Sequence, residues 1–107
     1  MLKLKKLLCL SPIYKYQVTG QSMCPTFKPG DTVLVNRLSY LTKLPIIGDI
    51  VAIKDPRDDK ALIKRIAKIE NDKFFVAGDN KNESTDSRNF GLISKRNIIG
   101  KVVYTKK

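Results

Sequence analysis

Three short patterns in this sequence contain the residue types that a hydrolytic site requires. They are the segment around Ser22, the pair Lys64 and Arg65, and a polar stretch over residues 78–91. A serine hydroxyl becomes a good nucleophile only when a neighbouring base accepts its proton. The 107 residues include no histidine, which excludes Ser-His-Asp and Cys-His hydrolases as well as His-ligated zinc or haem sites. The base must therefore be another residue type.

Lysine can serve as that base if its surroundings favour the neutral amine. The ordinary pKa of lysine is about 10.4, so deprotonation at neutral pH costs about 4.6 kcal/mol. Burial can lower a lysine pKa by as much as ~3–5 units. Lys64 lies between Ile63 and Ile66, which would provide an apolar wall if the segment is a strand. Gly20 allows a close backbone approach beside Ser22, whose own N–H could stabilise an oxyanion.

The rest of the chain predicts a mainly β fold that holds these patterns in place. Apolar, β-branched and aromatic runs bounded by Gly, Pro, Asp or Asn are typical of strands. Such runs occur at residues 32–35, 50–53, 74–76 and 98–104. They favour a small barrel or coiled sheet. The segment 61–70 fits a helix and a strand equally well, so its periodicity leaves both possibilities open.

Composition and charge set the broad class. Leu, Ile, Val and Phe make up 33 of the 107 residues, enough for the core of one small domain. The net charge is +11, and residues 1–30 and 92–107 each carry five basic side chains and no acidic one. We expect a basic arm over residues 1–15 and a single domain over residues 16–107. Basic ends are typical of contact with an anionic partner, either lipid headgroups or nucleic acid, and equally of tails that only keep a small domain soluble. A stacking platform for nucleic acid is poorly supported, because no repeat interleaves basic and aromatic residues.

Two further absences limit the location and the cofactors. No run approaches the roughly 18 apolar residues of a membrane span, so we expect a cytoplasmic protein or a peripheral one at the membrane surface. Two cysteines, Cys9 and Cys24, are too few for a thiolate zinc site or a disulfide scaffold. We expect no metal and no cofactor.

In order and spacing, the three patterns resemble those of the type I signal peptidase family, serine proteases with a Ser–Lys dyad. The first box of the family is matched by Gly20, Ser22, Met23, Pro25 and Thr26, and its base strand by Lys64 and Arg65. The third box is matched in full over residues 78–91. The resemblance runs over residues 18–104 and implies a β-rich catalytic domain of the signal peptidase and LexA type, with Lys64 on a strand.

The resemblance also implies a role for each matched residue. Ser22 would be the nucleophile and Lys64 the general base. Ser84 would orient the lysine amine, and Asp86 with Arg88 would hold the third box against the site. Met23 would buttress the nucleophile loop. Gly20 stands where some members carry a serine that donates to the oxyanion, and the segment after the lysine is short, as in members without a large inserted subdomain.

The expected function is an endopeptidase that removes N-terminal leader or propeptide segments from protein substrates. One version is a signal peptidase that reaches an anionic membrane surface through its basic arm. The other is a dedicated maturase, similar to the short anchorless members that mature nickel-type superoxide dismutase. Two alternatives stay open: an inactive basic module that binds lipid or nucleic acid, and a LexA-like self-cleaving regulator.

Overall fold

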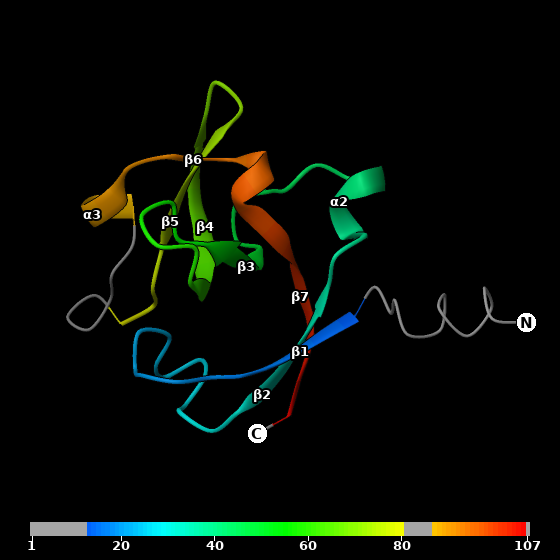
Figure 1. Ribbon diagram of the computed structural model, residues 1–107, viewed down its shortest axis with the longest axis vertical. Coiled ribbons are helices and arrows are strands. Elements are labelled where there is room, and N and C mark those ends of the chain that lie inside the picture. The colour runs from blue at the N-terminus through cyan, green and yellow to red at the C-terminus, as the bar shows by residue number, and fades with distance from the viewer. Residues whose placement is uncertain (1–12, 81–86, 107) are drawn as a thin grey trace, which may run out of the picture.

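The computed structural model describes residues 13–80 and 87–106 and shows one antiparallel sheet that coils on itself (Figure 1). Its seven strands lie in the spatial order β1-β2-β7-β3-β4-β5-β6. The strands are β1 Ile13–Gln17, β2 Thr32–Asn36, β3 Ile50–Lys54, β4 Ala61–Glu70, β5 Lys73–Ala77, β6 Ile93–Ser94 and β7 Ile98–Lys106. The short helical turns are α2 Ser39–Thr42, α3 Ser87–Phe90 and the 3-10 turn η1 Lys95–Asn97. The expected mainly β, coiled-sheet class is confirmed.

Alternation along the strands divides the core into two clusters. In β3, Val51 and Ile53 pack with Tyr40, whereas Ala52 between them packs with Met23. Successive side chains of a strand point to opposite faces, so the two clusters lie on opposite sides of β3. The first also contains Ile66, Phe74, Val76 and Ile93, and the second Val18, Phe27, Val33 and Val35.

The segment that periodicity left undecided is the long strand β4. It pairs with β3 over residues 61–65 and with β5 from Arg65 onward, with a register shift between Ile66 and Lys68. Pairing on both sides satisfies the backbone of a strand, and a helix at this place would leave one edge of β3 and one edge of β5 unpaired. The turn from β4 to β5 consists of Asn71 and Asp72, which have φ angles of 49° and 64°. Asn and Asp tolerate this left-handed conformation and favour such two-residue hairpin turns.

The N-terminal end of the chain falls only partly within the structure. Ile13 to Lys15, which belong to the expected arm, form the start of β1 and pair with β2. Residues 1–12 lie outside the described residues, so the arm and its boundary stay an expectation. Within residues 13–80 and 87–106, no helix is long and apolar enough to cross a membrane.

Candidate active site

Ser22 lies in the loop that connects β1 to β2, and backbone hydrogen bonds close this loop at its base. The N–H of Val18 donates to the carbonyl of Asp31 at 2.7 Å, and the N–H of Gly30 donates to the carbonyl of Val18 at 2.8 Å. Within the loop, the N–H of Phe27 donates to the carbonyl of Met23 at 2.9 Å. Met23 and Phe27 are 2% and 3% exposed and belong to the second core cluster. Their buried side chains therefore anchor the loop to the core.

Gly20 precedes Ser22 in this loop and has a backbone conformation that favours glycine. Its φ angle is +72°, in the left-handed region that side chains with a Cβ rarely adopt. A side chain there would meet no atom within 4 Å, so the requirement for glycine comes from the backbone angle and not from space. The sequence predicted a close backbone approach at Gly20, but the described residues place no atom that near, and the backbone angle is what favours glycine here.

The segment after β5 holds the Ser22 loop from its other side. The N–H of Asn80 donates to the carbonyl of Ser22 at 2.8 Å, and its side-chain amide donates to the carbonyl of Gln21 at 3.1 Å. The N–H of Asp79 lies 3.4 Å from the sulfur of Met23. The start of the third box therefore fixes the backbone of the nucleophile loop directly.

Asp79 links this loop to β4. Its carboxylate accepts from Arg65 Nε at 2.9 Å and from Nη2 at 2.8 Å, and it also accepts from the Thr26 hydroxyl. Arg65 in turn donates to the carbonyl of Gly48 at 3.2 Å. The hydrogen bond from Arg65 holds the pKa of Asp79 below its ordinary value against an opposing effect of burial, and the carboxylate raises the pKa of Arg65. Asp79 is thus ionised at neutral pH and joins all three sequence patterns.

Lys64 precedes Arg65 on β4 and faces the interior. Its side chain is 2% exposed, and it stands opposite the fully buried Val51 in the ladder between β3 and β4. Among the described residues it is the one lysine in the buried class. Lys64 and Arg65 are neighbours on β4 but have different surroundings. Lys64 is buried, whereas Arg65 forms an ion pair with the half-buried Asp79.

A small cavity of about 90 Å³ lies between the Ser22 loop and β4. Ser22 lines it, together with Leu62 and Ile63, the two residues that precede Lys64. The remaining lining residues are Tyr16, Gln17, Val18, Thr19 and Ala61. Desolvation by burial raises the pKa of Tyr16, one of these residues, above its ordinary value.

Two strand edges border this cavity. β1 is an edge strand of the sheet. In the described part of the chain, Ala61, Leu62 and Ile63 have ladder partners on β3, whereas the pairing of β4 with β5 begins at Arg65. An extended peptide in this cleft could add to the edges of both strands, as peptides do when they extend a sheet.

The structure describes only some of the residues expected at the site. Gly20, Ser22 and Met23 lie together in one loop, and Lys64 lies on β4, the strand whose residues 61–63 line the same cavity as Ser22. Arg88 is an exposed residue of α3. Ser84 and Asp86 lie outside the described residues, so their expected roles stay expectations. Among the described residues, no three His, Cys, Asp or Glu side chains are placed to hold a metal ion.

Sequence reasoning missed two polar groups of structural importance. It named Asp86 and Arg88 as anchors of the third box and gave no role to Asp79, which pairs with Arg65 and accepts a hydrogen bond from Thr26. All three of these residues occur within the motifs, which was the available signal. The second group is Ser87, which is 4% exposed and whose side-chain oxygen accepts the backbone N–H of Val76 at 2.9 Å.

The chain matches a family of proteases along nearly its whole length. The family model described as signal peptidase, peptidase S26, matches residues 3–73 and 67–105. The two matched pieces meet at the tight turn between β4 and β5. This is the segment that the sequence identified as short relative to members with an inserted subdomain.

The related proteins come from bacteria and from plant organelles. The chain is 31% identical over 136 residues to signal peptidase I V of Bacillus subtilis, a match that covers 79% of this chain and 80% of the relative. It is 31% identical over 116 residues to the mitochondrial ATP-independent inner membrane protease subunit 2 of Arabidopsis thaliana, covering 85% of this chain and 56% of the relative. Signal peptidase I of Leptolyngbya laminosa is 26% identical over 131 residues, covering 80% of this chain and 64% of the relative.

These matches agree with the motif boxes in the sequence and with the coiled β-sheet that carries them. They confirm the resemblance found from the residues. The chain belongs to the signal peptidase family of peptidase S26, the type I signal peptidases.

Proposed function

We propose that this protein is a serine endopeptidase that removes N-terminal leader or propeptide segments, with Ser22 as nucleophile and Lys64 as general base. The observation that carries the proposal is the burial of Lys64 on the strand whose preceding residues line the same cavity as Ser22. A buried amine loses the hydration that favours its charged form. Burial of Lys64 therefore favours the neutral amine that a general base requires.

The chemistry follows from these two groups. An extended substrate lies in the cleft between β1 and β4, and Ser22 Oγ attacks the carbonyl carbon of the scissile bond while Lys64 Nζ takes the hydroxyl proton. The resulting ammonium then gives that proton to the departing amine, which leaves an acyl-enzyme. Water hydrolyses the ester by the same proton transfers. The backbone N–H of Ser22 is the candidate donor to the oxyanion, since Gly20 has no hydroxyl to offer.

The size of the cavity bears on the residues accepted before the cut. A volume of about 90 Å³ between Leu62, Ile63 and Tyr16 accommodates a side chain such as that of alanine or serine. Larger side chains would have to displace apolar groups that pack against the two core clusters. We therefore expect small residues in the substrate at the position that enters this cavity.

Two versions of the function differ in the number of substrates. The relatives are named as signal peptidases and as an inner membrane protease subunit, which supports leader removal as the general activity. The short turn after β4 supports the version with one dedicated substrate, as in the maturases of nickel-type superoxide dismutase, because little structure is available for added recognition.

The test is a profile of protein N-termini in the native cell, comparing the intact gene with Ser22→Ala. Ser39→Ala on α2 is the matched control. Many retained leaders would identify a general signal peptidase, and one retained leader would identify a dedicated maturase together with its substrate. Identical profiles for Ser22→Ala and the intact gene would contradict the proposed function.

A further inference from the structure

A second surface, away from the Ser22 loop, combines exposed apolar side chains with basic ones. We define the α2–η1 surface as residues 37–47 together with residues 95–99. In Figure 1, α2 lies on the opposite side of the molecule from the blue loop between β1 and β2 that carries Ser22. This surface therefore lies outside the cavity to which the proposed peptidase site belongs.

The apolar part of this surface is unusually exposed. Leu41 and Leu44 are each 76% exposed, and Ile46 and Ile47 are 60% and 62% exposed. Single exposed apolar residues are ordinary on protein surfaces, but a contiguous group of them marks a contact site. Leu38 in the same segment is 49% exposed.

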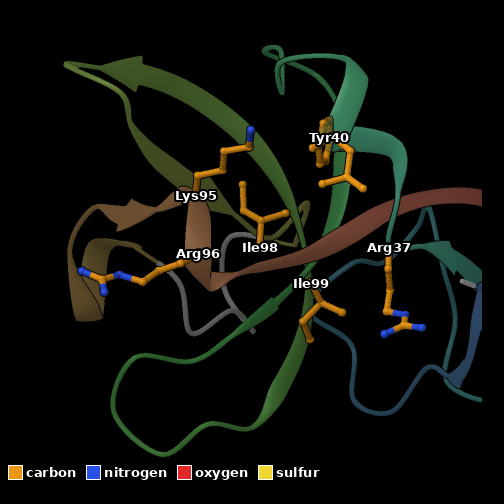
Figure 2. Close-up of a pocket in the computed structure, with 7 residues that line it drawn as sticks. Arg37, Tyr40, Lys95, Arg96, Ile98 and Ile99 are labelled. Atoms are coloured by element: carbon orange, nitrogen blue, oxygen red, sulfur yellow. The ribbon is translucent and has the colours of Figure 1, made fainter. Parts of the chain in front are cut away.

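Two hollows lie on this surface, and Lys95 lines both of them. The larger, of about 450 Å³, is lined by four apolar or aromatic side chains and three basic ones, Tyr40, Leu41, Ile98, Ile99, Arg37, Lys95 and Arg96. The smaller, of about 280 Å³, is lined by Leu44, Pro45, Ile69, Asp72, Phe74 and Lys95. Figure 2 shows Lys95 and Ile98 pointing toward Tyr40, with Arg96 directed to one side and Arg37 to the other.

The charges of this surface are mostly positive, and Asp72 in the smaller hollow is the exception among the residues that line the two hollows. Residues 37–47 and 92–107 contain no carboxylate. The neighbouring Asp49 is occupied, because it accepts from the Tyr40 hydroxyl at 2.7 Å and lies 3.6 Å from the Lys101 amine. An anionic partner would therefore meet few carboxylates that repel it.

We infer that the α2–η1 surface docks the protein onto an anionic phospholipid bilayer. The basic side chains of the larger hollow point in different directions (Figure 2), which suits several anionic headgroups in one plane better than a single anion held by converging donors. The exposed leucines and isoleucines enter the boundary between headgroups and acyl chains, as the apolar face of a peripheral protein does. Anionic headgroups attract each nearby Lys or Arg with about 1 kcal/mol, so each contributes roughly a fivefold change in binding.

The test is sedimentation of the full chain with vesicles, which measures binding without reference to catalysis. Vesicles of phosphatidylcholine alone are compared with vesicles of phosphatidylcholine and phosphatidylglycerol in equal parts. The unaltered protein is expected to bind only the anionic vesicles. Replacing Lys95 and Arg96 together by Gln should weaken this binding on the order of tenfold or more.

Matched controls separate a defined surface from the general positive charge of the protein. Lys28→Gln with Lys54→Gln removes the same charge from other exposed positions and should change binding little, because screening limits each charge to about 10 Å. Leu41→Ser should weaken binding about tenfold through lost apolar burial, whereas Leu92→Ser, at an exposed leucine beyond α3, should not.

Three results would overturn the inference. Equal losses in the two charge variants would show that net charge alone drives binding. Unchanged binding of Leu41→Ser would show that the apolar residues do not enter the bilayer. Loss of self-association in Leu41→Ser, with vesicle binding retained, would assign the surface to a second copy of the chain.

Discussion

Arg65 and Asp79 form a bidentate ion pair, with nitrogen–oxygen distances of 2.9 and 2.8 Å, that ties β4 to the segment following β5. The same carboxylate accepts from Thr26 of the Ser22 loop. The residue before Arg65 is the buried Lys64, and the residue after Asp79 binds the carbonyl of Ser22. This pair therefore sets the relative positions of the two elements that carry the proposed dyad.

Replacing Asp79 by Asn should destabilise the fold and slow cleavage. The substitution removes the charge and one of the two acceptors that Arg65 uses. Because Arg65 is 37% exposed, solvent screening limits the loss to about 1–2 kcal/mol. Chemical denaturation measures the loss of stability. Turnover at saturating substrate measures the loss of activity expected when the Ser22 loop shifts. Asp58→Asn, at an exposed position in the turn after β3, is the control, and equal effects of both substitutions would contradict a special role for Asp79.

The stability of the protein should fall in acid, in part through Asp79. The pKa of Asp79 is lowered in the folded state by the hydrogen bond from Arg65. A lowered carboxyl pKa stabilises the fold at pH values above the unfolded pKa, near 4, and this contribution disappears as the pH falls through the folded pKa. The pKa of Asp55, beside Arg57, is lowered as well and acts in the same direction.

Denaturation from neutral pH down to about pH 3 checks this linkage. The unaltered protein should lose stability more steeply than Asp79→Asn, in which only the contribution of Asp55 and other carboxylates remains. Parallel curves for the two proteins would mean that the ion pair does not perturb Asp79 in solution.

Ser87→Ala should destabilise the fold more than the position of Ser87 at the start of a short helix indicates. Its hydroxyl oxygen accepts the N–H of the fully buried Val76 at 2.9 Å. The substitution removes the side-chain oxygen that accepts this buried N–H, which lowers the free energy of unfolding by about 1–3 kcal/mol. Thermal unfolding compares this variant with Ser39→Ala, for which a change below about 0.5 kcal/mol is expected. A melting temperature equal to that of the control would contradict the assigned role.

Gly100→Ala should also destabilise the sheet, through a steric conflict between β7 and β2. A Cβ atom at Gly100 would lie 2.5 Å from the carbonyl oxygen of Asn36 and 2.9 Å from Val35 Cγ1. Backbone cannot move away as a flexible side chain can, so strain of about 1–3 kcal/mol is expected. Val103→Ala, at an exposed position on the same strand, is the control. Unchanged stability of Gly100→Ala would show that the two strands can separate at no cost.

The sequence predicted the strands whose apolar runs end at turn residues. The expected runs at 32–35, 50–53, 74–76 and 98–104 correspond to β2, β3, β5 and β7. It left β4 undecided, because alternation and helical periodicity both fit residues 61–70 and only pairing with β3 and β5 resolves them. It did not predict β1, whose lysine and tyrosines give no apolar run and which is held by its ladder to β2.

The candidate site could be anticipated by residue type but not by contact. The motif spacing singled out Ser22, Lys64 and the box that begins at Gly78. The link from Asp79 to Arg65 spans 14 positions of the chain and that to Thr26 spans 53, so no local pattern shows that they meet. Gly100 carries no sequence signal, because its requirement comes from the approach of a strand that is distant in the sequence.

The most direct test of the proposed dyad is the cleavage rate of Ser22→Ala, Lys64→Met and the protein with both changes, measured on a leader-bearing substrate. Met fills the space of the buried lysine with an apolar chain, and Lys54→Met is the control at an exposed position. Residues that act as one unit show non-additive losses, so we expect all three variants to fall to the same residual rate while Lys54→Met stays active. Near-normal cleavage by a folded Lys64→Met protein would contradict the account.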